Sequence, residues 1–213
     1  MKGQLITIEG ISGVGKTHIF DRIKENCKTN DIVFNSEITD SVHLGYNKMI
    51  YEILTSSNSR FFDTGNPKME TLLIAAKLAN DEENILIPAL NEGKTVVSDR
   101  GYDTMCIIQG ILFSLKYNSD LNTDIEDLYC TLKKYCKIPD KTILLIDNFN
   151  KCIKRAENRD CVKYSEKEKY ILFKSYEYFI KMASKHKERF YVLNVGDLNE
   201  KQIIEKILEI INV

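Results

Sequence analysis

The feature that most constrains this chain is an eight-residue, glycine-rich motif near its N-terminus. It reads Gly10-Ile11-Ser12-Gly13-Val14-Gly15-Lys16-Thr17 and matches G-x-x-x-x-G-K-[ST] at every fixed position. The apolar run Leu5–Ile8 precedes it, and from Lys16 the apolar spacing becomes helical. Such a loop turns successive backbone N–H groups into one concavity, at which the next helix directs its positive end. We therefore expect a nucleoside triphosphate site, with Lys16 on the terminal phosphates and Thr17 on Mg²⁺.

The composition of the chain narrows its class and its partners. Across 213 residues, 30 Lys and Arg balance 31 Asp and Glu, so nothing favours nucleic-acid binding. We expect no signal peptide and no membrane span, because no apolar stretch is long enough. The six cysteines include no C-x-x-C pair, which favours free thiols in a reducing compartment. These features predict a cytoplasmic protein with no membrane partner.

Short apolar runs alternate with helical patterns along the whole chain. We expect strands at 5–8, 32–34, 95–98, 142–146 and 190–193. The main helices are expected at 43–54, 67–92 with a kink at Pro88, 102–116, 123–136 and a last one carrying Ile203 to Ile211. This alternation predicts an α/β fold in which helices cover both faces of a parallel sheet. Ligands of such sheets collect beyond the carboxyl ends of the strands.

Three of these strand ends carry charge, at Glu9, Asp99-Arg100 and Asp147. The carboxylate of Asp99 is suited to holding Mg²⁺ directly or through water, and the guanidinium of Arg100 to clamping a phosphoryl oxygen. A structural ion pair would give the same dipeptide, but its place after a phosphate-loop motif favours function. Asp147 is predicted both to edge the site and to cap the next helix. The aromatic-rich run 170–180 is predicted to pack in the core rather than to line a pocket.

Several stretches resemble one known family together, over nearly the whole chain. They are Leu5–Gly10, Leu72–Ala76 with Ile87–Leu90, Asp99-Arg100 with Thr104 and Gln109-Gly110, Pro139-Asp140, Asp147, and Arg155 with Arg159. In residue type and spacing they are similar to the thymidylate kinase family. The resemblance implies a P-loop NTPase fold with a five-stranded parallel sheet, in one domain over 1–213 with a small lid at roughly 155–166. It also implies ATP-dependent phosphoryl transfer to a nucleoside monophosphate, most often dTMP, usually in a homodimer.

The resemblance implies a role for individual residues as well. Gly10 to Thr17 would hold the ATP phosphates and Mg²⁺, with help from Asp99, and Arg155 and Arg159 would neutralise the moving phosphoryl group as the lid closes. Asn194 and Asp197 would lie beside adenine. The acceptor would be held by Glu37, Ile74, Leu78, Arg100, Thr104 and Gln109. Transfer between two polyanions requires several cations that arrive together and exclude water, whatever the family.

The sequence departs from the family pattern on the acceptor side. The family carries an acid where this chain has Ser12, and an arginine where it has Ser36. A stacking phenylalanine and a base-reading arginine are replaced by Ile74 and Leu78. An apolar replacement loses the discrimination that hydrogen bonds to a base provide. The identity of the acceptor therefore stays open at the level of sequence.

Two explanations of these departures compete. The chain is a diverged thymidylate kinase in which other residues, such as Lys77 or Tyr102, compensate, or it takes another nucleotide, a nucleoside or a small metabolite. A GTP-hydrolysing switch is disfavoured, because Asn150-Lys151-Cys152-Ile153 lacks the aspartate of N-K-x-D. A regulatory protein that binds ATP without transferring it is disfavoured by intact Lys16, Thr17 and Asp99-Arg100.

Overall fold

The computed structural model describes residues 3–27, 29–37, 45–57 and 59–212, and these fall into two compact units. The first unit contains residues up to Asn35, Ala89–Arg100 and Pro139 onward, and the second contains Ser36–Pro88 and Gly101–Ile138. No helix among the described residues combines the length and apolar character needed to cross a membrane.

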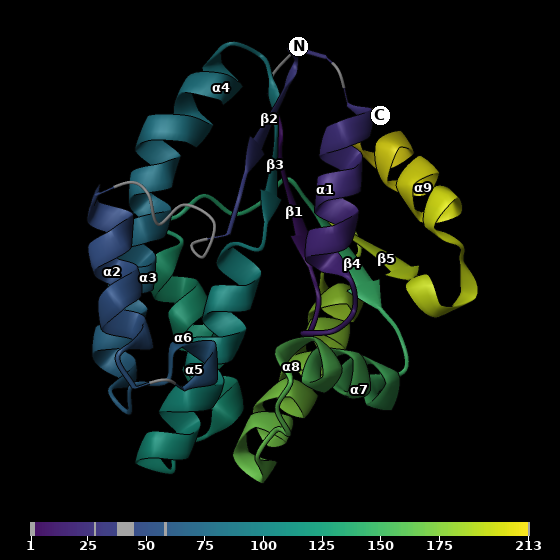
Figure 1. The fold of residues 1–213 in the computed structure, drawn as a ribbon. Coiled ribbons are helices and arrows are strands. Elements are labelled where there is room, and N and C mark those ends of the chain that lie inside the picture. Colours follow the sequence, from purple (N-terminus) through teal and green to yellow (C-terminus); the bar gives the residue numbers. More distant parts are fainter. Residues whose placement is uncertain (1–2, 28, 38–44, 58, 213) are drawn as a thin grey trace. The chain divides into compact units, whose positions relative to one another are not determined.

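The first unit is built on a five-stranded sheet (Figure 1). Its strands are β1 (Leu5–Glu9), β2 (Ile32–Asn35), β3 (Thr95–Asp99), β4 (Lys141–Ile146) and β5 (Phe190–Asn194). They run in the order β2-β3-β1-β4-β5, and every neighbouring pair is parallel. All five strands predicted from the apolar runs are confirmed, as is the parallel sheet. Because the strands are parallel, Glu9, Asp99 and the residue after Ile146 lie at the same edge.

The sheet is buried most deeply at its centre. All five residues of β1 are buried, and Ile6, Ile8, Ile143 and Leu144 have no exposed surface. Central parallel strands covered on both faces bury every side chain, which explains why their sequences are unbroken apolar runs rather than alternating ones. Burying one such side chain contributes about 1.5–3 kcal/mol. The sheet therefore supplies a rigid frame for whatever lies at its edge.

Among the described residues, four whole helices and one short turn also belong to the first unit. They are α1 (Lys16–Asn26), α7 (Phe149–Asp160), α8 (Glu166–Lys185), the 3-10 turn η3 (Val195–Asp197) and α9 (Glu200–Asn212). Helices α1 and α9 lie side by side (Figure 1), and Glu200 accepts hydrogen bonds from His18 and Arg22 across their contact. The predicted lid stretch 155–166 comprises the last turns of α7, the connection 161–165 and the first residue of α8. Its movement stays a prediction.

The second unit is helical. Its elements are α2 (Gly45–Thr55), the 3-10 turn η1 (Arg60–Phe62), α3 (Pro67–Asp81), the π turn η2 (Glu82–Leu86), α5 (Tyr102–Tyr117) and α6 (Leu121–Leu132), while α4 (Ile87–Asn91) crosses the boundary between units. A cluster of buried side chains joins α3, α5 and α6: Ala75, Tyr102, Met105, Cys106, Leu132 and Cys136. The helix predicted at 43–54 is confirmed from Gly45, and residues 43 and 44 lie outside the described residues.

Two helix predictions in this unit need correction. The single helix expected over 67–92 is α3, a π turn and α4 in succession, with the Ile87 N–H bonded to the Glu82 carbonyl. Pro88 has no N–H to donate and its ring crowds the carbonyl four residues earlier, so a widened turn before it relieves the conflict. The helix expected at 123–136 runs instead from Leu121 to Leu132, because the Asp120 side chain caps it by accepting from the Thr123 N–H at 2.9 Å.

The start of α8 generates a stability prediction. Ser165 and Glu168 form a capping box, in which the Ser165 hydroxyl accepts from the Glu168 N–H and the Glu168 carboxylate accepts from the Ser165 N–H at 2.7 Å. Ser165→Ala should lower the free energy of unfolding by about 1 kcal/mol, as measured in urea. Ser184→Ala on the same helix removes only a hydroxyl bonded back to the Ile180 carbonyl and should leave stability within about 0.5 kcal/mol of wild type. Equal effects would contradict the capping argument.

Candidate functional site

The glycine-rich motif forms a loop between β1 and α1 whose path requires glycine. Gly10, Gly13 and Gly15 adopt φ of 140°, 82° and 105°, a region that side-chain-bearing residues avoid. A Cβ on Gly13 would lie 2.0 Å from the Cys152 carbonyl oxygen, and one on Gly10 would lie 2.5 Å from the Leu145 carbonyl oxygen. The loop backbone therefore packs directly on the backbones of α7 and β4. This is the curled path expected of a phosphate-binding loop.

Lys16 and Thr17 begin α1 and face the loop and the neighbouring strand. The Lys16 ammonium is buried and donates to the Ile11 carbonyl at 3.1 Å, so it lies across the loop. The Thr17 hydroxyl donates to an oxygen of Asp99, at the end of β3, at 3.3 Å. A hydroxyl and a carboxylate oxygen this close form a pair that suits Mg²⁺, which binds few protein oxygens and completes its shell with phosphates and water. The structure thus brings together three residues that the sequence placed at one site.

Arg100 directly follows Asp99 in an unusual backbone conformation. Its φ is 65°, in the left-handed region, while its N–H donates to the Ile8 carbonyl of β1 at 3.1 Å. For a residue with a side chain this conformation costs about 1–2 kcal/mol. Strain of this kind gathers at functional sites, where the surrounding structure maintains it. The location of Arg100 at the sheet edge is consistent with its predicted contact to a phosphate.

Arg155 of α7 is held by a carboxylate at the end of β4. Its Nη2 lies 2.6 Å from Oδ2 of Asp147, and its Nη1 lies 3.4 Å from the Gly13 carbonyl oxygen. Burial by itself would raise the pKa of Asp147, but hydrogen bonds from the Asn148 N–H and the Arg155 guanidinium outweigh it and lower that pKa. The Asp147 carboxylate is therefore ionised at neutral pH, and the Arg155 guanidinium lies between it and the phosphate loop.

Arg159, the other arginine assigned to the lid, has a different partner. Its guanidinium makes two bonds to the Asp160 carboxylate, at 2.8 and 3.1 Å, and these bonds raise its pKa. Tyr164 donates its hydroxyl to the same carboxylate at 2.6 Å. Glu157 accepts from the Tyr164 N–H at 3.0 Å and ties the 161–165 connection to α7. In this structure the predicted lid carries a local network of its own.

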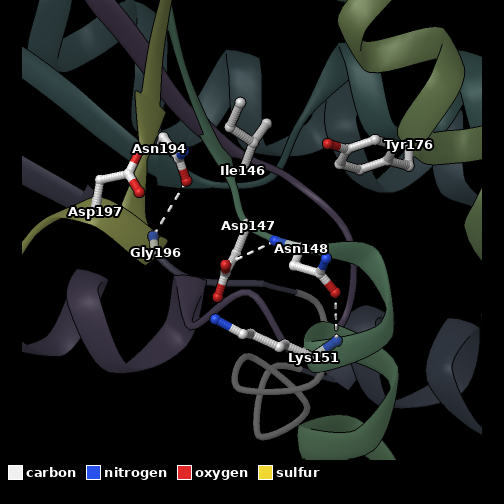
Figure 2. Close-up of a pocket in the computed structure, with 8 residues that line it drawn as sticks. All are labelled: Ile146, Asp147, Asn148, Lys151, Tyr176, Asn194, Gly196 and Asp197. Carbon is white, nitrogen blue, oxygen red and sulfur yellow. Dashed lines mark hydrogen bonds between the residues drawn. The ribbon is translucent and has the colours of Figure 1, made fainter.

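A pocket of about 230 Å³ opens beyond the carboxyl ends of β4 and β5 (Figure 2). Its lining residues are Ile146, Asp147, Asn148, Lys151, Tyr176, Asn194, Gly196 and Asp197. The Asn194 amide accepts from the Gly196 N–H at 3.2 Å and donates to Asp197 at 2.5 Å. In Figure 2 the Lys151 side chain extends toward Asp147, while Asn194 and Asp197 line the β5 side. The two residues that the resemblance placed beside adenine thus line a pocket in the same unit as the phosphate loop.

The sequence interpretation missed part of this pocket. The helix cap is Asn148, whose side chain accepts from the Lys151 N–H at 3.2 Å, and not Asp147 as predicted. Asp147 lies one residue before that cap. Its buried carboxylate accepts a hydrogen bond from Arg155 instead. Tyr176 lies in the 170–180 run that was assigned to the core, and Ile171, Leu172 and Phe179 are indeed buried there. The signal that distinguishes Tyr176 from those buried residues is its position around the helix, which places it on a different face.

The residues predicted to bind the acceptor, Arg100 excepted, lie in the second unit. Ile74 and Leu78 pack against its buried cluster. Gln109 is fully buried and accepts a hydrogen bond from the Thr71 hydroxyl at 3.0 Å. Within the described residues its side-chain nitrogen has no hydrogen-bond partner, so it is an unsatisfied buried donor. Glu37 and Thr104 are partly exposed, and their roles stay predictions.

The two residues considered as compensating ones are engaged within the second unit. Lys77 forms a buried ion pair with Asp81 one helical turn away, at 2.6 Å. Tyr102 is buried, its hydroxyl donates to the Tyr129 carbonyl, and burial raises its pKa. Tyr102 thus packs in the buried cluster and links α5 to α6 through its hydrogen bond to Tyr129. In this structure its hydroxyl does not stand ready for an acceptor.

Comparisons with known proteins point to one family. The thymidylate kinase family model matches residues 8–207. A probable thymidylate kinase of Methanococcoides burtonii is 31% identical over 219 residues, covering 99% of each chain, and one of Methanosarcina barkeri is 29% identical over 221 residues, covering 100% of this chain and 99% of the relative. Among solved structures, the thymidylate kinase of Candida albicans has a TM-score of 0.72 at 18% identity, covering 99% of this chain and 92% of its own. That of Ehrlichia chaffeensis has a TM-score of 0.66 at 19% identity and full coverage of both chains. At these identities the two structures support the fold alone, and they confirm the predicted α/β fold with a five-stranded parallel sheet.

The close approach of Gly13 to α7 generates a prediction about nucleotide binding. Gly13→Ala places a Cβ where the Cys152 carbonyl oxygen lies and forces the loop away from α7. We expect a loss of at least about tenfold in affinity for Mg-ATP by titration calorimetry, which corresponds to about 1.4 kcal/mol. Gly45→Ala, at the start of α2 where an added Cβ meets open space, serves as the control and should bind as wild type does. Unchanged affinity in Gly13→Ala would show that the loop does not need this contact.

Proposed function

Because the chain belongs to the thymidylate kinase family, we propose that it transfers the γ-phosphoryl group of ATP to dTMP, giving ADP and dTDP. One observation carries the proposal: the glycine-dependent phosphate loop ends in Thr17, whose hydroxyl meets the Asp99 carboxylate at 3.3 Å. That arrangement supplies both the phosphate cradle and a pair of oxygens for Mg²⁺ on the donor side of a kinase.

The residues at the sheet edge divide the work of transfer. Backbone N–H groups of the loop hold the phosphates of ATP, and Lys16 moves from the Ile11 carbonyl to the terminal phosphates. Thr17 and Asp99 would hold Mg²⁺, which when bound would supply positive charge beside the phosphates. Arg100 grips the phosphate of the acceptor, so that its oxygen is presented in line with the γ-phosphorus. The acceptor oxygen forms the new P–O bond as ADP leaves.

The predicted lid supplies the remaining positive charge. Arg155 already lies against the loop at the Gly13 carbonyl, and Arg159 leaves Asp160 for the phosphoryl group when the lid closes. Charge-assisted bonds to a phosphoryl group are worth more once water is excluded, because the local dielectric falls. Exchange of the Asp160 carboxylate for phosphate oxygens keeps the guanidinium paired throughout. The lid and the sheet form a single kinase domain in this proposal.

The pocket at the ends of β4 and β5 is proposed to take the adenine of ATP. Lys151, Tyr176 and the Asn194–Asp197 segment provide one flat aromatic face and several polar groups around it. Aromatic faces stack on bases of any identity, and polar groups at the rim select among them. Its place in the unit that holds the phosphate loop supports this assignment.

The acceptor site is proposed to take a pyrimidine nucleotide, with dTMP first. The buried Gln109 nitrogen costs about 1–3 kcal/mol as long as it lacks a partner, and a carbonyl oxygen of a base would relieve that cost. Ile74 and Leu78 offer apolar surface in place of stacking and hydrogen bonding. The altered positions keep one alternative open: a kinase of the same fold that phosphorylates another nucleotide, a nucleoside or a small metabolite.

A homodimer in the cytoplasm completes the proposal. Helix α2 presents Tyr46, Met49 and Ile53 to solvent along one stripe, and α3 exposes Leu72. Apolar groups exposed in a stripe of this spacing mark a surface that a partner helix would cover. All six cysteines carry free thiols, which agrees with a reducing compartment.

The acceptor is tested by a panel of nucleotides. ADP formation from Mg-ATP is followed with each common nucleoside monophosphate and each free nucleoside. We expect the highest kcat/KM with dTMP, and Lys16→Ala should lower kcat at least about a hundredfold, since it removes a cation from the developing charge. Greater turnover with another acceptor would replace dTMP in the proposal. ATP hydrolysis that no acceptor changes would overturn the kinase assignment.

The dimer is tested by mass in solution. Light scattering behind size exclusion should give twice the mass of one chain for the wild type. Met49→Glu places a charge on the α2 stripe, where the native side chain is 59% exposed, and should weaken the dimer at least about tenfold without unfolding the chain. Lys201→Glu on α9 is the control, since it lies in the other unit. A monomeric wild type would contradict the dimer proposal.

A further inference from the structure

Asp147 lies where three segments of the first unit meet: the end of β4, helix α7 and the turn after β5. It follows β4 directly, its side chain is 4% exposed, and its two carboxylate oxygens accept from different donors. Oδ1 accepts from the Asn148 N–H at 2.7 Å, and Oδ2 accepts from Nη2 of Arg155 at 2.6 Å. A Cβ on Gly196 would lie 2.4 Å from Oδ1, so the segment after β5 also approaches the carboxylate closely. These two hydrogen bonds fix the carboxylate between Asn148 and Arg155.

The guanidinium of Arg155 makes two contacts within the protein and is otherwise exposed to solvent. Its side chain is 50% exposed, although the carboxylate that it contacts is buried. The bonds to Asp147 and to the Gly13 carbonyl use two of the five guanidinium donors. The planar guanidinium can therefore keep both contacts and still present N–H groups to a phosphoryl oxygen.

From this arrangement we infer that Asp147 is a positioning residue for phosphoryl transfer. Its carboxylate fixes the Arg155 guanidinium against the backbone of the phosphate loop before ATP and the acceptor arrive. The inference rests on the proposed function, and it assigns to Asp147 no contact with either substrate's reacting atoms. It distinguishes Arg155, which is set in place by the sheet, from Arg159, which is held by a carboxylate of its own helix.

The advantage of this arrangement is pre-organisation. An arginine side chain free in solvent loses rotamer entropy when it is fixed, and that loss would fall on the transition state if fixing waited for the reaction. A buried partner directly after β4 moves that loss into folding. The Asp147 charge also offsets the cations around it, since Arg155 and Lys151 both lower its pKa. The guanidinium of Arg155 is thus fixed beside the phosphate loop, and the negative charge of Asp147 reduces the repulsion between Arg155 and Lys151.

A double-mutant cycle tests the inference. Asp147→Asn keeps the shape and the bond from the Asn148 N–H but removes the charge that holds Arg155. We expect kcat with Mg-ATP and dTMP to fall about tenfold, with KM for dTMP within about twofold of wild type. Arg155→Ala should fall further, and the double variant should equal Arg155→Ala, because Asp147 acts through Arg155. Asp147→Glu restores the charge and should recover part of kcat, while Glu205→Gln on the exposed face of α9 is the control carboxylate.

Independent effects of the two substitutions, or an Asp147→Asn variant as fast as wild type, would overturn the inference. A second readout needs no acceptor: the side-chain Nε–H signal of Arg155 in ¹⁵N spectra, assigned by its loss in Arg155→Ala. It should be sharp in the wild type and averaged toward free arginine in Asp147→Asn. An unchanged signal would also overturn the inference. If the wild type fails to phosphorylate dTMP, the proposed function fails, whereas the spectra still decide whether Asp147 holds Arg155.

Discussion

The contact on which the candidate site depends is between two backbones. Gly13 comes so close to the Cys152 carbonyl that no side chain fits between them. The phosphate loop therefore rests on the first half of α7, and the bond from Arg155 to the Gly13 carbonyl links the same two segments. Because interiors are close-packed, a shift of α7 is transmitted to the loop rather than absorbed. The phosphate loop, α7 and the Arg155 side chain are therefore held together at the end of the sheet.

Much of the first unit could be predicted from sequence because its physical requirements are local. A buried parallel strand needs an apolar run, and a phosphate loop needs glycines at fixed intervals before a helix. Both signals lie within about a dozen residues, and for this reason the sequence predicts all five strands and the loop correctly. The pairing of Thr17 with Asp99 also followed, since neighbouring parallel strands end at a common edge.

The remaining features depend on contacts that the sequence does not encode locally. The π turn before Pro88 reflects a conflict between two valid signals, a helical pattern and a proline. Asn148, and not Asp147, caps α7, and the Asp147 carboxylate instead accepts from Arg155, which lies eight residues further along the chain. Tyr176 looks like its buried neighbours in composition and differs only in which way it faces. On the acceptor side, the sequence does not show that the Tyr102 hydroxyl donates to the Tyr129 carbonyl, because the two residues lie 27 positions apart.

The residue beneath the phosphate loop also bears on the chemistry of its sulfur. Cys152 has no exposed surface, and burial raises the pKa of its thiol to about 11. Since thiolates are the species that oxidants and alkylating reagents attack, this sulfur stays inert at neutral pH. Cys130 and Cys161 are exposed to solvent, so oxidants reach these two thiols first. Oxidation of this chain would therefore begin at the exposed cysteines. The buried Cys152, on whose backbone the phosphate loop packs, would be oxidised later.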